Sequence, residues 1–364
     1  MQQKSKIPTV LIAPLDWGLG HATRCIPIIR IMNQNGWRVI LAADGNTASL
    51  LKNEFPDLLL VALKGYNIHY STKKWMLPFT ILLQVPKILS TIKTEYYWLQ
   101  NTIDIHQIDL VISDNRYGLH SSKTHSVFIT HQLTIKMPFG WLERWVQKTN
   151  YNYIQQFSQC WIPDFEGANN IAGVLSHPKT LPNIPTKYIG PLSRFIKKEA
   201  VDFQYTFCIL LSGPEPQRTI LEKIILKDIT TLNEKIILVR GKPNATETLS
   251  STDKVTIYNH LSGEALNSVI QASEYTISRS GYTTVMELLY LQKKAILIPT
   301  PAQTEQEYLA EKLCQQQWCY VVPQYQFNIQ SAIDEAKQFQ YQLPEINNET
   351  LSYTILKLIQ QLSN

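Results

Sequence analysis

The sequence lacks the signature motifs of several enzyme classes. It contains no G-x-x-x-x-G-K-[ST] and no G-x-S-x-G, which argues against a P-loop nucleotide-binding protein and against an esterase with a nucleophile elbow. No D-x-D and no Cys/His cluster with metal-ligand spacing occurs, so nothing in the sequence requires a divalent metal. No uninterrupted run of about 18 apolar residues is present, so we expect no transmembrane helix.

Cysteine and charge are also scarce. The five cysteines are an odd number and form no C-x-x-C, which favours buried thiols in a reducing compartment. Charged residues make up 17% of the chain and apolar residues 44%, which excludes a highly charged disordered protein and a coiled coil. Pro8, Pro14 and Asp16 interrupt the first apolar run, so we expect a strand there and not a signal peptide. A cytoplasmic protein is the expectation that follows.

The charge is unevenly distributed along the 364 residues. Residues 1–190 contain 18 Lys and Arg against 11 Asp and Glu, whereas the rest of the chain contains 16 against 18. A basic first half favours an anionic partner, such as a membrane surface or a phosphorylated acceptor. A solvated basic surface explains the same counts equally well.

Short apolar runs alternate with helix-like segments, which is typical of two doubly wound, Rossmann-like α/β domains in tandem. Prolines and glycines interrupt this alternation at 182–203, where we place the linker. We expect a first domain at 1–190, a second at 191–343, and a last segment at 344–364 with an amphipathic helix at 349–362. The expected strands are 9–13, 38–42, 58–61, 110–113, 127–130, 159–162, 207–212, 235–239, 255–258, 275–278 and 295–299.

Ligands of doubly wound sheets bind beyond the carboxyl ends of the strands, so we expect a site in a cleft between the two domains. The loop after the first strand contains Gly18, Gly20 and His21, and a histidine there either accepts a proton near neutral pH or serves to cap the following helix or to pack against it. Arg24 either binds a phosphate or carboxylate or forms a surface salt bridge. Asp114 either orients the imidazole or begins an Asx turn.

Other loops also follow strands. His131 and Gln132 come after a first-domain strand and face the same cleft, and Gly213 follows the first strand of the second domain. The segment 278–287 combines a strand end, a Ser-Gly turn and a helix start with two hydroxyls, which suits a diphosphate. Glu287 lies one turn into that helix, where it either binds ribose hydroxyls or is solvated.

The segment 278–287, SRSGYTTVME, resembles the R-S-G-x-x-T-x-x-E nucleotide-binding stretch of GT-B glycosyltransferases, closest to family 28. Residues 305–308 resemble that family's sugar-reading glutamine segment, and residues 18–21 resemble its first-domain glycine-rich loop. Gly213 stands where the family has a more glycine-rich phosphate loop. The family includes the enzyme that adds N-acetylglucosamine to the lipid intermediate of peptidoglycan.

The resemblance implies the GT-B fold, with a C-terminal helix that returns to the first domain. It also implies that His21 is a general base paired with Asp114, that Glu287 binds ribose, and that Gln306 and Glu307 contact the donor sugar. Glu307 departs from the second glutamine that is common in the family. The remaining implied donor-binding residues are Gly213, Arg279, Ser280, Gly281, Thr283 and Thr284, and the expected acceptor-side residues are Gly18, Gly20, Arg24, His131 and Gln132.

The implied reaction is an inverting, metal-independent sugar transfer. The donor is a nucleotide-sugar, with UDP-linked sugars and UDP-N-acetylglucosamine as the first candidates, and the acceptor is a hydroxyl of a lipid-linked or other glycan. We expect no cofactor and no nucleic-acid partner. The alternatives are a nucleotide-sugar 2-epimerase of the same architecture and a non-catalytic nucleotide-sugar-binding partner protein.

Two stretches of the basic first half, 73–79 and 136–145, mix Lys and Arg with aromatic residues. This composition suits peripheral contact with an anionic membrane, here the inner face of the cell membrane. Ordinary core is the alternative of equal weight.

Overall fold

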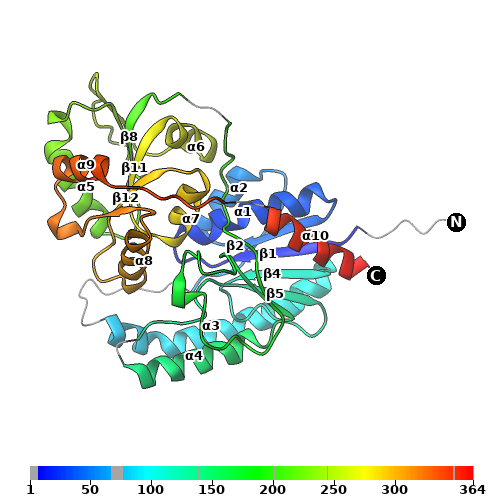
Figure 1. Ribbon diagram of the computed structural model, residues 1–364. Coiled ribbons are helices and arrows are strands. Elements are labelled where there is room, and N and C mark those ends of the chain that lie inside the picture. Colours follow the sequence, from blue (N-terminus) through cyan, green and yellow to red (C-terminus); the bar gives the residue numbers. More distant parts are fainter. Residues whose placement is uncertain are drawn as a thin grey trace. The chain divides into compact units, whose positions relative to one another are not determined.

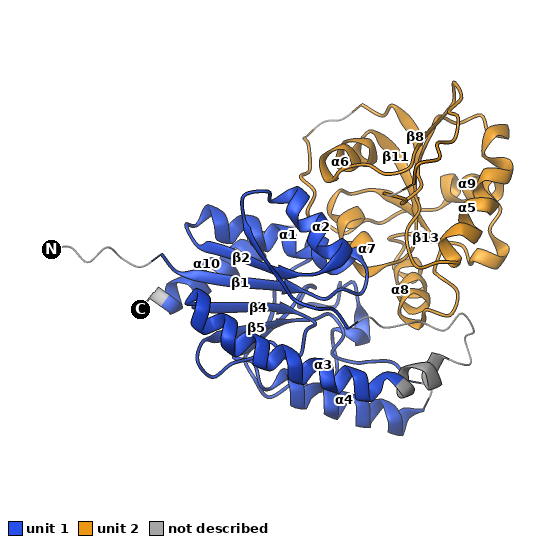
Figure 2. Ribbon diagram, turned by 180° about the vertical axis from the view of Figure 1, so that it is seen from behind, with its two compact units in different colours: residues 1–192, 347–364 blue, residues 193–346 orange. Residues whose placement is uncertain are grey.

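The computed structural model describes residues 7–66, 77–137, 139–199, 202–243, 245–346 and 349–363. The chain divides into two compact units, residues 1–192 with 347–364 and residues 193–346, which Figure 2 colours separately. Each unit is built on a parallel β-sheet with helices on its faces (Figure 1). The doubly wound α/β architecture expected from the sequence is confirmed.

The sheet of the first unit has the strand order β3-β2-β1-β4-β5-β6-β7. In Figure 2, α1, α2 and α10 lie on one face of this sheet, and α3 and α4 lie on the other. The strands are β1 (Thr9–Pro14), β2 (Arg38–Ala43), β3 (Leu59–Ala62), β4 (Leu110–Asp114), β5 (His125–Ile129), β6 (Gln159–Ile162) and β7 (Thr186–Tyr188). The helices are α1 (Leu19–Gln34), α2 (Gly45–Glu54), α3 (Leu77–His106), α4 (Gly140–Ile154) and α10 (Glu349–Ser363), with the 3-10 turn η2 (Gly173–Leu175).

The sheet of the second unit has the strand order β10-β9-β8-β11-β12-β13. Its strands are β8 (Tyr205–Leu210), β9 (Ile236–Val239), β10 (Val255–Tyr258), β11 (Ser273–Ser278), β12 (Lys294–Leu297) and β13 (Tyr320–Val321). Its helices are α5 (Gln217–Asp228), α6 (Gly263–Gln271), α7 (Tyr282–Tyr290), α8 (Thr304–Gln315) and α9 (Ile329–Gln338), with the 3-10 turns η3 (Ile229–Thr231) and η4 (Gln324–Gln326).

The central strands are apolar along most of their length because helices cover both faces of the sheet. Every residue of β1, with the sequence TVLIAP, is buried, and so is every residue of β4. Leu11 and Ala13 of β1 share a core cluster with Leu99 and Ile103 of α3. The strands that end at the candidate site are therefore held by packing.

Each expected strand is present within two residues of its predicted bounds, but the sequence reasoning missed β7, β13 and the long helix α3. The expected linker at 182–203 is wrong over its first part, because β7 lies there and pairs with β6. Both missed strands are short and only half-buried, so neither shows the continuous apolar run that marks the others.

Helix α10 belongs to the first unit and contacts α1. Ile355 and Leu358 are buried and Tyr353 is exposed, so the amphipathic pattern predicted for the tail is confirmed. None of the helices in the described ranges combines the length and the apolar character that crossing a membrane requires.

A buried ion pair ties α3 to the loops around the central strands. Arg116 Nε donates to Glu95 Oε1 at 2.8 Å, and its Nη2 donates to the Lys64 carbonyl at 2.5 Å. Glu95 Oε2 accepts from the Tyr66 hydroxyl at 2.8 Å and from the Gly118 N–H at 3.1 Å. These hydrogen bonds satisfy the carboxylate, which is the condition for burying an ion pair.

Gly118 is required where α3 approaches this loop. A Cβ at that position would lie 2.2 Å from the Ile92 carbonyl oxygen and 2.5 Å from Glu95 Cβ. We expect Gly118→Ala to reduce the free energy of unfolding by about 1–3 kcal/mol, the usual cost of overpacking, and to lower the melting temperature in calorimetry. Gly167→Ala is the control, because nothing lies within 4 Å of its Cβ position. Equal melting temperatures for the two variants would contradict the prediction.

Candidate functional site

Most candidate residues lie at the carboxyl ends of the two sheets. The strand order reverses between β1 and β4 in the first sheet and between β8 and β11 in the second. Ligands of doubly wound folds bind beyond such reversals. In the first unit His21 follows β1 and Asp114 ends β4, and in the second unit the Gly213 loop and the segment 279–287 follow β8 and β11. Each unit therefore presents a candidate site of its own.

His21 and Asp114 meet at the reversal of the first sheet. His21 Nδ1 lies 3.1 Å from Asp114 Oδ1, the carboxylate is fully buried, and the His21 side chain is 15% exposed. We expected His21 in the loop after β1, but it lies in the first turn of α1. The helix already begins at Leu19, directly after Gly18, whose φ is 79°. With Nδ1 facing Asp114, the other ring nitrogen, Nε2, lies on the far side of the ring.

Arg24 lies between the same carboxylate and a second histidine. Its Nε donates to Asp114 Oδ2 at 2.6 Å, and its Nη2 donates to Asp114 Oδ1. Nη1 lies 3.1 Å from His131 Nδ1, and Nη2 lies 2.9 Å from His21 Nδ1. The alternative of a surface salt bridge is wrong, because Arg24 is buried and the carboxylate that it binds is Asp114 of the chain itself.

The charges around Asp114 set the protonation states of the pair. Burial alone would raise the pKa of Asp114, but Arg24 and His21 outweigh it and hold that pKa well below its usual range. Burial lowers the pKa of His21, and Arg24 lowers it further against the raising effect of Asp114. His21 is therefore neutral and Asp114 ionised at neutral pH, as a base and its orienting carboxylate must be.

Gln132, another acceptor-side candidate, is held through its backbone. Its N–H donates to Thr130 Oγ1 at 3.0 Å, and its carbonyl accepts from the amide of Asn150 on α4 at 3.3 Å. Asn150 is buried and also accepts from the Tyr117 hydroxyl at 2.8 Å. The inner face of α4 thus fixes the loops that follow β4 and β5.

The outer face of α4 exposes aromatic rings. Trp141 and Trp145 are 65% and 62% exposed, and Phe139, 61% exposed, stacks on Trp141 with the ring centroids 6.4 Å apart. The alternative that this stretch is ordinary core is therefore wrong for these three rings. The exposed basic residues of the same stretch are Lys136 and Arg144, and Lys148 of α4 is exposed just after it. The side chains of the other aromatic stretch, 73–79, lie outside the described residues.

The start of α7 holds the motif of the second unit. Gly281 precedes the helix, and the positive end of the helix dipole suits an anion. Thr283 and Thr284 are half-buried in its first turn. Ser280 is fully buried, and its hydroxyl donates to the Gln306 carbonyl at 2.8 Å, so it joins this turn to α8.

The loops after β8 and β12 adjoin each other. Gly213 has a φ of 100°, and a Cβ there would lie 3.8 Å from Thr300 Oγ1. Gln306 Oε1 accepts from the Thr300 N–H at 3.0 Å, and Glu307 Oε1 accepts from the Ala302 N–H at 3.2 Å. Both side chains at the predicted sugar site, on the first turn of α8, therefore also hold the loop that leads into that helix.

The guanidinium of Arg279 is buried and bonded to the protein itself. Its Nη1 donates to the carbonyls of Ile298 and Pro299 at 3.2 and 3.4 Å, and its Nη2 donates to the Gln217 carbonyl at 2.8 Å and to Gln324 Oε1 at 2.6 Å. Burial lowers the pKa of Arg279 to about 10, so it stays charged at neutral pH. The structure thus shows Arg279 joining loops, and the donor contact that the motif implied stays a prediction.

Glu287 is paired with Arg194, a residue that the sequence reasoning missed. Arg194 Nε lies 2.9 Å from Glu287 Oε1, and the glutamate is buried, so its solvated alternative is wrong. Burial raises the pKa of Glu287, although Arg194 opposes this effect. No motif marks Arg194, because only the fold brings it to α7.

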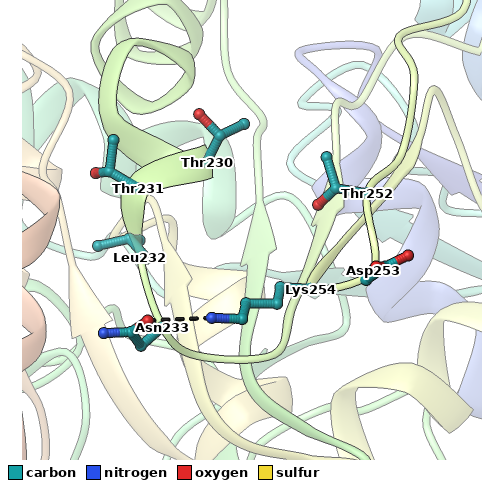
Figure 3. A pocket seen from close by; sticks show the side chains of 7 residues that line it. All are labelled: Thr230, Thr231, Leu232, Asn233, Thr252, Asp253 and Lys254. Atoms are coloured by element: carbon teal, nitrogen blue, oxygen red, sulfur yellow. Dashed lines mark hydrogen bonds between the residues drawn. The ribbon is translucent and has the colours of Figure 1, made fainter.

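A pocket lies at the amino-terminal ends of two strands of the second sheet, whereas the candidate residues lie at the carboxyl ends. Its lining segments, 230–233 and 252–254, precede β9 and β10, and Lys254 Nζ donates to Asn233 Oδ1 at 3.0 Å across it (Figure 3). None of the predicted site residues lines it. In the part of the chain that the structure describes, no group of three or more His, Cys, Asp or Glu is placed to hold a metal ion.

Two comparisons by sequence identify relatives. Residues 213–362 match the model of the Glycosyltransferase family 28 C-terminal domain. The UDP-N-acetylglucosamine--N-acetylmuramyl-(pentapeptide) pyrophosphoryl-undecaprenol N-acetylglucosamine transferase of Buchnera aphidicola subsp. Schizaphis graminum is 29% identical over 152 residues. That match spans 40% of this chain and 40% of the relative.

Solved structures resemble the chain over nearly its whole length. MurG of Acinetobacter baumannii has a TM-score of 0.57 at 14% identity and covers 97% of this chain and 99% of its own. The glycotransferase of kitacinnamycin has a TM-score of 0.63 at 13% identity and covers 98% and 95%. At these identities the likeness shows the fold, and it confirms the GT-B architecture expected from the sequence.

Asp114→Asn removes the charge that Arg24 needs. Leaving a buried ion without its partner costs about 3–5 kcal/mol. We therefore expect the free energy of unfolding, measured by urea titration at pH 7, to fall by that amount. Because the pKa of Asp114 is lower in the folded protein than its unfolded value of about 3.9, its stabilising contribution is present above that pH and declines below it. The difference in the free energy of unfolding between the wild type and Asp114→Asn should therefore be smaller at about pH 3 than at pH 7.

The matched control is Asp104→Asn, which removes an exposed ion pair with Lys123. Such surface pairs contribute about 0–1 kcal/mol. If Asp114→Asn were no more destabilising than this control, or if its effect did not change with pH, the assignment of a buried Asp114–Arg24 pair would be contradicted.

Proposed function

Since residues 213–362 match the model of the glycosyltransferase family 28 C-terminal domain and the chain has the GT-B fold, we propose that the protein is a glycosyltransferase that uses a nucleotide-sugar. The observation that carries the proposal is the His21–Asp114 pair at the reversal between β1 and β4. A neutral histidine held by an ionised carboxylate is suited to remove the proton of an acceptor hydroxyl. A non-catalytic binding protein gives no reason for such a pair.

In the proposed reaction the acceptor oxygen attacks the anomeric carbon of the donor while His21 Nε2 takes its proton. The bond from that carbon to the diphosphate oxygen breaks, and the nucleoside diphosphate leaves with inversion at the carbon. Asp114 accepts from Nδ1–H of the imidazolium and stabilises its charge. The imidazolium then returns its proton to solvent, so that His21 is neutral for the next cycle.

The charge that develops on the leaving diphosphate falls at the start of α7. Dipoles and hydroxyls that are fixed in advance stabilise such a charge, and we propose that they do so without a metal ion or cofactor. Glu287 binds the ribose in this scheme, and Gln306 and Glu307 bind the sugar. The groups assigned to the diphosphate are Gly213, Gly281, Thr283 and Thr284.

The name of the curated relative supports UDP-N-acetylglucosamine as the donor to test first, with a lipid-linked glycan as the acceptor. The outer face of α4 supports a lipid acceptor, because exposed tryptophans beside lysine and arginine suit the interface of an anionic membrane. Its inner face holds the loop of Gln132. A lipid-bound acceptor would thus be presented close to the loops that end at the base, at the inner face of the cell membrane.

His21→Ala and Glu287→Gln test the two ends of the reaction separately. We expect His21→Ala to reduce kcat by about 10²–10⁴-fold, the usual contribution of a general base, and to leave the calorimetric Kd for UDP unchanged.

Glu287→Gln should instead weaken UDP binding, because a carboxylate accepts stronger hydrogen bonds from hydroxyls than an amide does. His21→Ala with wild-type turnover, or Glu287→Gln with wild-type affinity for UDP, would refute the corresponding role.

Trp141→Ala with Trp145→Ala tests the membrane face. We expect the double variant to bind phosphatidylglycerol vesicles roughly tenfold more weakly or worse in flotation, because each lost indole removes buried apolar area at the interface. Phosphatidylcholine vesicles should bind even the wild type weakly. Tyr325→Ala, which removes an 83% exposed ring from η4, is the control. Equal flotation of all three proteins would remove the support for a lipid acceptor.

A further inference from the structure

Arg24 presents only hydrogen-bond donors to the two histidines beside it. A guanidinium has N–H groups and no acceptor, and Arg24 Nη1 lies 3.1 Å from His131 Nδ1. Arg24 therefore contacts a second buried histidine beside the proposed base.

His21 Nδ1 faces an acceptor and a donor at once. Asp114 Oδ1 lies 3.1 Å away, and Arg24 Nη2 lies 2.9 Å away. When Nδ1 carries the proton it donates to Asp114, and Nε2 is a base. When His21 becomes an imidazolium, its Nδ1–H and its positive charge lie against the guanidinium. Arg24 therefore opposes the charged form of His21, whereas Asp114 supports it.

Arg24 also controls where Asp114 lies. It binds both carboxylate oxygens, Oδ2 through Nε and Oδ1 through Nη2, a two-point contact that fixes the plane of the carboxylate. The titratable and charged groups around the pair are Arg24 and Cys25 of α1, Asp114 of β4, and His131 after β5. Arg24 contacts the carboxylate and both imidazole rings.

We propose that Arg24 is a positioning residue for the catalytic pair: it holds Asp114 in the plane that His21 reaches, and its charge keeps His21 in the neutral, proton-accepting form. This inference rests on the proposed role of His21 as the base. In this role Arg24 acts through Asp114 and His21, and the acceptor contact expected from the sequence stays a separate prediction.

Two substitutions separate the charge of Arg24 from its geometry. Arg24→Gln removes the charge, so the acidic limb of the kcat/KM profile should move to higher pH, because His21 loses a neighbour that lowers its pKa. Arg24→Lys keeps the charge but not the two-point contact with Asp114. The acidic limb of the kcat/KM profile should therefore stay at the wild-type pH, while kcat falls by roughly 10–100-fold. Arg30→Gln on the same helix is the control and should change neither.

A titration of the imidazole nitrogens by ¹⁵N NMR gives a readout that needs no activity. The His21 signal is assigned by its loss in His21→Asn, and it should titrate at higher pH in Arg24→Gln than in the wild type. If Arg24→Gln lowered kcat without moving the titration or the acidic limb, Arg24 would be merely structural and the proposal overturned.

A moved titration in a protein with no transferase activity would support the role of Arg24 and refute the proposed function instead. Should Arg24→Gln not fold, Arg24→Lys carries the test. The proposal then requires that His21 in Arg24→Lys titrates close to the wild-type pH and that kcat falls. An unchanged kcat in Arg24→Lys would overturn it.

Discussion

The carboxylate of Asp114 is shared by an arginine and a histidine, and the candidate base depends on that sharing. It is possible because β1 and β4 are adjacent parallel strands whose ends are in register, with Pro14 opposite Asp114. The chain leaves β1 and enters α1 at once, so His21 and Arg24, one turn apart, reach the same carboxylate. A fully buried carboxylate without these partners would be protonated, and neither histidine nor arginine would be oriented.

The second unit has a different set of charged and polar groups at the strand-order reversal of its sheet. Its arginine after the end of β11, Arg279, is buried and donates to three backbone carbonyl groups. The reversal also carries backbone N–H groups, hydroxyl groups and the ion-paired Glu287. In the proposed scheme the donor is bound mainly by fixed dipoles, in agreement with the nearly balanced charge of this half of the sequence.

The sequence predicted what depends on local pattern. The buried strands are continuous apolar runs, and the segment 278–287 carries its motif within ten residues, so both were found. What it could not predict depends on contacts across the fold. Arg24 and Asp114 are 90 residues apart, and no spacing rule links them. The tryptophans of α4 recur one helical turn apart, a spacing that fits a buried face as well as an exposed one, and only the structure shows which face is covered.

The most direct test of the account is release of UDP by the purified wild-type protein, measured with UDP-N-acetylglucosamine and other UDP-sugars in the presence and absence of a lipid-linked glycan acceptor. We expect UDP release with at least one of these donors only when the acceptor is present, and a product whose anomeric configuration is inverted. Isomerisation of a donor in the absence of acceptor, as an epimerase would give, or no release with any donor, would contradict it.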